Sequence, residues 1–199
     1  TDGLLILSLI HELLRAGKID LDYLARWTNA PVLVNADPKS PEHGLFLRDE
    51  DGTPLVLDRR TGKPAPFDAA GVRPDLAGTW RRAGVTHRPV MHLIAEAYLD
   101  PAYAPEAVAD RCGLSADRIR ALAAELARVA FDEAEEMPYE WEDFRGERHE
   151  TVTMRPVAFH AMRGISAHSN GFQTARALHV LQILLGTVER PGGFRFKPP

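Results

Sequence analysis

The sequence has little cysteine, no long apolar run and no excess of positive charge. With Cys112 alone among 199 residues, neither a disulfide framework nor a cysteine-ligated cluster can be built, and a reducing compartment fits best. No apolar run approaches the roughly 20 residues of a membrane span. The net charge of −4 favours neither nucleic acid nor an anionic membrane as a partner. We therefore expect a cytoplasmic protein with no direct membrane insertion and no nucleic-acid partner.

The two ends of the sequence suggest that it belongs to something longer. The chain starts at Thr1 rather than at methionine, and Thr1-Asp2-Gly3 leads straight into a helical pattern without a signal peptide. It stops at Pro199, just after a Pro-Gly-Gly motif. We expect an internal fragment of a larger chain, so part of any active site would lie elsewhere.

Apolar residues at helical spacing alternate with segments rich in proline and glycine. Ser115 is a predicted N-cap, and Gly113 is a predicted helix stop. The spacing predicts helices over about 4–14, 20–27, 90–98, 106–112, 116–131 and 172–185. Residues 32–85 and 138–154 are predicted to be surface excursions that contain β-hairpins, the first around Asp51-Gly52.

The most informative stretch is Arg155–Gly193. The short apolar run Val157–Met162 predicts a strand, and the polar loop Gly164–Gly171 follows it and leads into a long helix. In α/β proteins this unit brings the carboxyl end of a strand and the free N–H groups of a helix to one spot. We therefore expect one α/β domain over residues 1–199. Its sheet would be mostly parallel and flanked by helices, as in dinucleotide-binding folds, with two β-hairpin excursions.

A hydrolytic function does not fit this loop. Gly164-Ile165-Ser166-Ala167-His168 resembles a nucleophile elbow, but the fifth position holds histidine where a small residue is needed. No aspartate follows Asp143 and no histidine follows Glu189, so the usual order of the triad cannot be completed.

A zinc site is not indicated either. His149, His160, His168 and His179 lack the spacing of a helical zinc site, and no carboxylate stands beside them in an obvious pattern. His11 starts a zinc-helix motif that fails four residues later, and we expect it to be a surface or edge histidine. Two interpretations of the loop stay open, a cradle for a large polar cofactor and a polar surface turn that only connects core elements.

Several blocks of the sequence together resemble the molybdopterin oxidoreductases of the dimethyl sulfoxide reductase family. The resemblance spans nearly the whole chain, with Thr187 a mild departure from the asparagine that is frequent there. The blocks are Thr1-Asp2-Gly3 with its leucine-rich helix, Ile19–Leu24, Tyr103–Glu106, Cys112–Ile119, Gly164–Gly171, and Leu185-Gly186 followed by Pro191-Gly192-Gly193. Within the family, His160–Gly171 is most similar to large subunits that act on sulfur oxyanions, such as sulfite dehydrogenase and thiosulfate or polysulfide reductase. Formate dehydrogenase-like chains come next.

The resemblance implies a molybdenum (or tungsten) ion held by two molybdopterin guanine dinucleotides, with a 4Fe-4S cluster elsewhere in the full-length chain. No metal ligand is implied within this fragment. Arg163 and His168 would be catalytic, Arg163 steering an anion and His168 bonding to pterin or substrate. The implied cofactor-binding residues are Thr1, Asp2, Gly164, Ile165, Ser166, His168, Ser169, Asn170 and Gly171.

The implied partners are the rest of the catalytic chain, an iron–sulfur electron-transfer subunit and a membrane anchor subunit, through which the protein could associate with a membrane. The expected function is part of a catalytic subunit for two-electron redox chemistry of a small oxyanion. Three alternatives remain: a non-catalytic scaffold of the same fold, an independent nucleotide-binding module, and a formate dehydrogenase-like subunit.

Overall fold

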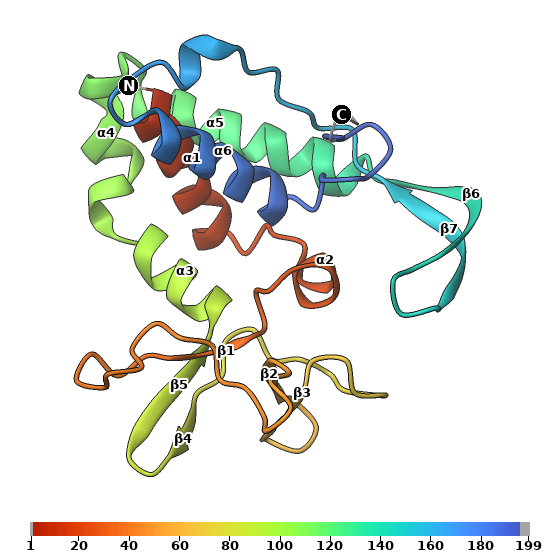
Figure 1. Ribbon diagram of the computed structural model, residues 1–199. Helices are drawn as coiled ribbons and strands as arrows, with labels where there is room; N and C mark the ends of the chain where they lie inside the picture. Colours follow the sequence, from red (N-terminus) through yellow and green to blue (C-terminus); the bar gives the residue numbers. More distant parts are fainter. Residues whose placement is uncertain (1, 196–199) are drawn as a thin grey trace. The chain divides into compact units, whose positions relative to one another are not determined.

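The computed structural model describes residues 2–195, which form two compact units. Among the described residues, the first unit joins 2–20 to 98–195, and the second contains Leu21–Ala97. The first unit holds the helices α1, α4, α5 and α6 and a long hairpin, whereas the second combines short strands with two helices (Figure 1).

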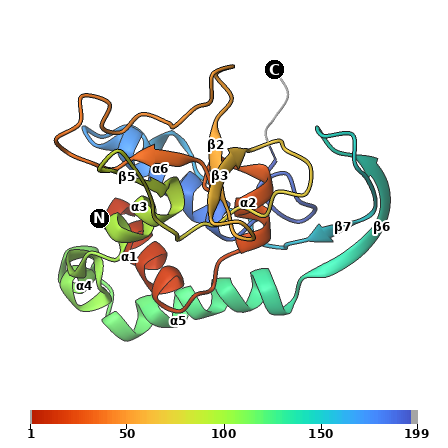
Figure 2. The same cartoon turned by 90° about the horizontal axis from the view of Figure 1, so that it is seen from below.

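Helix α1 (Asp2–Arg15) is the centre of the first unit. It packs against α4 (Pro105–Cys112), α5 (Ala116–Ala127) and α6 (Gly171–Leu184) (Figures 1 and 2). Because three helices surround it, its apolar residues are not confined to one stripe, and Ile10 and Leu13 are completely buried. Each such side chain contributes about 1.5–3 kcal/mol to stability.

The ends of α4 and α5 follow the signals in the sequence. Gly113 closes α4 with a φ of 69°, a left-handed conformation that glycine adopts without strain. The Ser115 hydroxyl caps α5 by accepting a hydrogen bond of 3.2 Å from the Arg118 N–H. The two predicted helix boundaries are therefore confirmed, and Cys112 lies half-buried at the end of α4.

A buried carboxylate links α1 to its neighbours. Glu12 accepts hydrogen bonds of 3.0 and 2.8 Å from the Arg15 guanidinium, and Arg120 of α5 lies 3.9 Å away. Arg120 also pairs with Glu106 of α4. The hydrogen bonds from Arg15 lower the pKa of Glu12, so this carboxylate stays ionised in the helical core.

The pair formed by Arg155 and Asp20 ties distant parts of the first unit together. The Arg155 Nη2 and Nε atoms donate to Asp20 Oδ2 at 2.6 and 3.0 Å, while Nη1 donates to the Ala130 carbonyl at 2.6 Å. The guanidinium also lies 4.8 Å from the centre of the Phe131 ring. Both charged side chains are nearly buried, with 13% and 10% exposed.

Asp20 also fixes the far end of α6. Its backbone N–H donates to the Leu184 carbonyl at 2.8 Å. Gly186, at a φ of 65°, lies so close that an added Cβ would come within 2.5 Å of Asp20 Oδ2. The start and the end of the segment 155–186 are therefore held at one point.

A hairpin of two antiparallel strands, β6 (Glu135–Glu142) and β7 (Arg148–Met154), extends from the helices of this unit (Figures 1 and 2). It follows a short helical segment, η2 (Arg128–Asp132), at the end of α5. The predicted second hairpin is thus present, and it starts three residues earlier than expected.

The second unit is built from small antiparallel sheets. The strands β1 (Leu33–Asn35), β5 (Val85–Pro89) and β4 (Trp80–Arg82) form one sheet in that order, and β2 (Leu55–Asp58) pairs with β3 (Lys63–Pro66) in another. Helices α2 (Leu21–Trp27) and α3 (Val90–Tyr98) flank these strands in the sequence. The predicted turn at Gly52 forms, since Leu55 N–H donates to Leu47 O at 2.9 Å.

The expected mostly parallel sheet is wrong. Every pair of named strands within residues 2–195 is antiparallel, and an isolated bridge between Val188 and Phe194 is parallel. The run Val157–Met162, expected to be a strand, forms no ladder and leaves His160 and Met162 exposed. For three of the four strand pairs, the physical reason is that short runs linked by tight turns pair with their sequence neighbours, whereas a parallel pair needs a crossover connection. The fold is mixed α/β without a dinucleotide-binding sheet.

None of the helices that residues 2–195 form is long and apolar enough to cross a lipid bilayer.

We predict that Arg155→Ala lowers the free energy of unfolding by about 3–5 kcal/mol, because it leaves the Asp20 carboxylate buried without its cation. Arg148→Ala is the matched control, since Arg148 is exposed and its nitrogen lies 3.9 Å from Glu142; its cost should be below about 1 kcal/mol. Urea unfolding of both variants measures the difference. Equal costs would contradict the proposed role of the buried pair.

Candidate functional site

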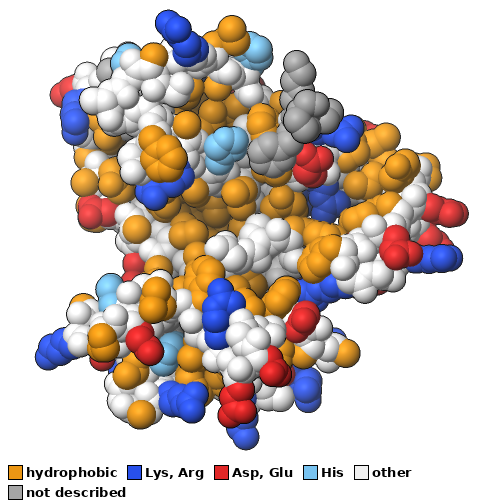
Figure 3. Space-filling model, in the orientation of Figure 1, with side chains coloured by type: hydrophobic (Ala, Val, Ile, Leu, Met, Phe, Trp, Pro, Cys, Tyr) orange, Lys and Arg blue, Asp and Glu red, His pale blue; other side chains and the backbone are white. Residues whose placement is uncertain are grey.

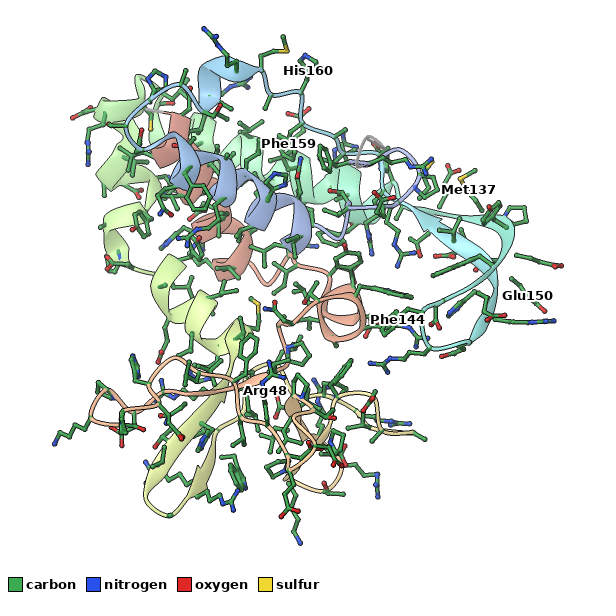
Figure 4. All side chains as sticks on the ribbon, in the orientation of Figure 1. Arg48, Met137, Phe144, Glu150, Phe159 and His160 are labelled. Carbon is green, nitrogen blue, oxygen red and sulfur yellow. The ribbon has the colours of Figure 1, made fainter. Side chains whose placement is uncertain are left out.

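The predicted site loop consists of Arg163 and the polar loop Gly164–Gly171. It lies on the surface of the first unit, between the extended segment after β7 and helix α6. It opens with one turn of 3-10 helix, η3 (Arg163–Ile165), and ends where α6 begins at Gly171. Figure 4 labels Phe159 and His160 on the segment that leads into it. The side chains of Arg163, Ser166, His168, Ser169 and Asn170 are exposed, and Ile165 is half-buried beneath them.

Backbone hydrogen bonds give the loop its shape. Ser166 N–H donates to Arg163 O at 3.1 Å, and Gly171 N–H donates to His168 O at 2.9 Å. The Ser166 hydroxyl also donates to Arg163 O, at 3.1 Å. Of the predicted site side chains, Ser166 is thus engaged within the loop itself, whereas Arg163, His168, Ser169 and Asn170 make no side-chain hydrogen bond to any residue in 2–195.

Gly171 allows the loop to fold back onto the helix start. A Cβ built on Gly171 would lie 2.0 Å from the Ser166 carbonyl oxygen, far inside van der Waals contact, and the neighbouring atoms are backbone. Only glycine fits there. The sequence marked Gly171 as a loop glycine, but the close approach to Ser166 could not be deduced from it.

The structure brings Asp2 to the same end of the unit. Asp2 is the exposed first residue of α1, and the next residue, Gly3, packs against Thr174 in the first turn of α6. A Cβ on Gly3 would lie 2.9 Å from Thr174 Oγ1. The starts of α1 and α6 therefore lie side by side next to the loop. Thr1, the other predicted contact, lies outside the described residues.

The electrostatics at this end favour a negatively charged or strongly polar group. The N–H groups of the first turn of a helix carry partial positive charge, and two such turns meet here. Arg163 adds a guanidinium that can make two parallel hydrogen bonds to an oxyanion. Asp2 opposes this field, but it stands at a helix start, where a carboxylate is itself stabilised.

A second cluster of polar groups lies in the turn of the β6–β7 hairpin. Potential ligand atoms of Asp143, Glu147 and His149 lie within 4.8 Å of one another, and His149 Nε2 is 3.1 Å from Asp143 Oδ2. The expectation that no carboxylate stands beside His149 is therefore wrong. Asp143 and Glu147 precede His149 across a tight turn, a spacing that could have signalled the contact.

Hydrogen bonds within the turn account for this cluster. The other oxygen of Asp143 accepts from the N–H groups of Arg145 and Glu147 at 2.8 and 3.0 Å. The His149 ring stacks on Trp141 with 4.5 Å between the ring centres. Because both oxygens of Asp143 have partners within the turn, we interpret the cluster as a set of contacts that stabilises the hairpin.

The remaining histidines do not join the site loop. His11 is buried and its Nδ1 lies 3.1 Å from the Tyr98 carbonyl, so the surface position expected for it is wrong. It is buried because three helices cover α1, which its local sequence does not reveal. His160 is exposed, and His179 makes an edge contact with the Phe194 ring.

Comparison with known protein-family models gives no match. Comparison with curated proteins finds a clear relative. Over its whole length, this chain is 44% identical to a sulfite dehydrogenase subunit of Allochromatium vinosum, across 209 aligned positions. The chain spans about a fifth of that protein, 21% of its length.

We predict that Gly171→Ala destabilises the site loop, at a cost of about 1–3 kcal/mol, because the new methyl group collides with the Ser166 carbonyl. Gly164→Ala is the matched control in the same loop, since a Cβ there meets no atom within 4 Å. Unfolding free energies and the rate of proteolysis in the loop measure both effects. A Gly171→Ala variant as stable as the control would show that the loop does not pack in this way.

Proposed function

We propose that this chain is part of the catalytic subunit of an oxidoreductase that acts on a small sulfur oxyanion. The observation that carries the proposal is the 44% identity over the entire chain to a protein named as a subunit of sulfite dehydrogenase. The exposed, donor-rich loop at the starts of α1 and α6 supports it, because an oxyanion substrate or an anionic cofactor needs such donors.

We further propose that the subunit works with molybdenum bis(molybdopterin guanine dinucleotide). The described loop residues fit the organic, phosphate-bearing part of this group: hydroxyl, amide, imidazole and guanidinium side chains are exposed, and Gly171 lets the backbone turn tightly beneath them. They do not provide a thiolate for the metal, because Cys112 lies at the end of α4. When bound, the molybdenum centre would supply the two-electron redox chemistry.

The residues of this chain would bind and orient. Arg163 would hold an oxyanion through paired N–H groups, and His168 would hydrogen-bond to pterin or substrate. Ser169 and Asn170 would contact the dinucleotide beside the first turn of α6, with Gly164, Ile165 and Ser166 shaping the loop. Asp2 would contribute from the start of α1, and Thr1 stays a proposed contact by its place in the sequence. Each interaction fixes the position of a bound group, which lowers the entropic cost of reaction at the metal.

A 4Fe-4S cluster elsewhere in the full-length chain, an iron–sulfur electron-transfer subunit and a membrane anchor subunit complete the proposal. The word "subunit" in the relative's name supports partner chains in general. Electron transfer away from the site would require further redox centres, which the proposed cluster and partner subunit would supply. A cytoplasmic location stays a prediction.

The decisive experiment uses the full-length protein. We expect the purified enzyme to contain molybdenum and two pterins per catalytic chain and to reduce an artificial electron acceptor with sulfite faster than with formate. A higher rate with formate would select the formate dehydrogenase alternative. Absence of molybdenum and pterin from protein made in a molybdate-replete host would refute the cofactor and favour a scaffold or a nucleotide-binding module.

We predict that His168→Ala in the full-length enzyme lowers turnover roughly a hundredfold, the usual effect of removing one hydrogen-bond donor at a reacting group. Molybdenum and pterin content should remain normal. His160→Ala is the matched control, since His160 is an exposed histidine of the same segment outside the proposed site. Unchanged turnover of the His168→Ala enzyme with normal molybdenum content would refute the role of His168.

A further inference from the structure

The β6–β7 hairpin, residues 135–154 and called the arm below, exposes an unusual amount of apolar surface. Met137, Tyr139 and Phe144 are 40%, 64% and 63% exposed, and Trp141 alone among the residues of β6 is half-buried. Figure 4 labels Met137, Phe144 and Glu150 along it. An isolated two-stranded hairpin is only marginally stable in water, so such an arm gains from a covering surface.

The strand register determines which residues of the arm share a face. Met137 faces Val152, Glu135 faces Met154 and Glu142 faces Arg148, and paired residues share one face of the ladder. Since Glu150 lies two positions before Val152, it shares that face too. The face therefore has Met137 and Val152 at its centre, Glu135 on one side, and Glu142 and Glu150 with Arg148 on the other. Figure 3 shows hydrophobic side chains on the arm, with acidic and basic ones along its margin.

The arm concentrates the negative charge of the chain. It contains seven acidic residues and two arginines, a net charge of −5, whereas the whole chain carries −4. The rest of the chain is therefore close to neutral. Such a charge disfavours anionic lipid and nucleic acid as occupants and favours a cationic surface.

Contacts within the arm favour its hairpin conformation. Asp143 closes its turn through the N–H groups of Arg145 and Glu147, and His149 bonds to Asp143 while stacking on Trp141. The Trp141 indole N–H donates to the Thr151 carbonyl at 2.9 Å, across the two strands. A preorganised element loses little entropy on docking.

We propose that the arm docks onto a separate partner polypeptide whose surface is apolar at its centre and lined with lysine and arginine. In terms of the proposed function, on which this inference rests, the partner is the iron–sulfur electron-transfer subunit. Opposite charge accelerates encounter between separate molecules, which explains why the charge is gathered on one protruding element.

The test replaces Glu135 and Glu150 by lysine in the full-length catalytic chain and measures its Kd for the purified iron–sulfur subunit. Both residues flank the apolar centre and are exposed. We expect the Kd to rise roughly tenfold or more and its dependence on salt to flatten. Glu50→Lys with Glu125→Lys is the matched control, because both side chains are exposed and lie outside the arm.

A photo-crosslinking experiment identifies the polypeptide that contacts the arm. With the photo-reactive p-benzoylphenylalanine in place of Tyr139 in the full enzyme, irradiation should join the catalytic chain to the iron–sulfur subunit, whereas the same group at Glu125 should not. A crosslink within the catalytic chain, a crosslink to a second copy, or a Kd that matches the control would overturn the proposal. Molybdenum and pterin content, measured on the same samples, separates failure of the arm from failure of the proposed function.

Discussion

The buried pair of Arg155 and Asp20 is the constraint on which the first unit depends. Its guanidinium is satisfied by a carboxylate, a backbone carbonyl and an aromatic face, and few arrangements satisfy all three at once. Because Asp20 also contacts Leu184 and Gly186, one point holds both ends of the segment that carries the site loop. The loop is polar and exposed, yet the segment 155–186 that carries it is held at both of its ends by this pair.

The two ends of the first unit have different properties. At one end, charge is buried and neutralised, and the chain is fixed. At the other end, the starts of α1 and α6 meet and donors face solvent beside Gly171. A binding loop needs this combination, because side chains can hold a ligand in position only when the backbone beneath them does not move.

Local features of the sequence predicted much of the helical structure. Ser115 and Gly113 marked helix ends by chemistry that acts within one turn, and the arm was predicted from its turn residues. The sheet was predicted wrongly, because strand pairing depends on partners that an apolar run such as Val157–Met162 does not specify. Arg155 and Asp20 are 135 residues apart, and no local pattern links them.

The sequence predicted the position and polarity of the loop, whereas its role as a binding site stays a prediction. The exposed polar side chains from Arg163 to Asn170 follow from a polar stretch that precedes a helix. The proximity of Asp2 came from the family resemblance, and its physical basis is the contact of Gly3 with Thr174, which only the folded chain reveals. The contact between His149 and Asp143 was missed, although a tight turn between them made it accessible to sequence reasoning.

The relative direction of α1 and α6 has a consequence for stability and ligand binding. They start together at Gly3 and Thr174, and the chain just beyond each of them meets again at Asp20 and Gly186, so the two helices run in the same direction. Neighbouring parallel dipoles repel each other, and their positive ends meet with Asp2 as the nearest compensating charge. An anion bound there removes this repulsion. By mass action, such an anion would raise the free energy of unfolding, so under the proposed function the loaded protein would be harder to unfold than the empty protein.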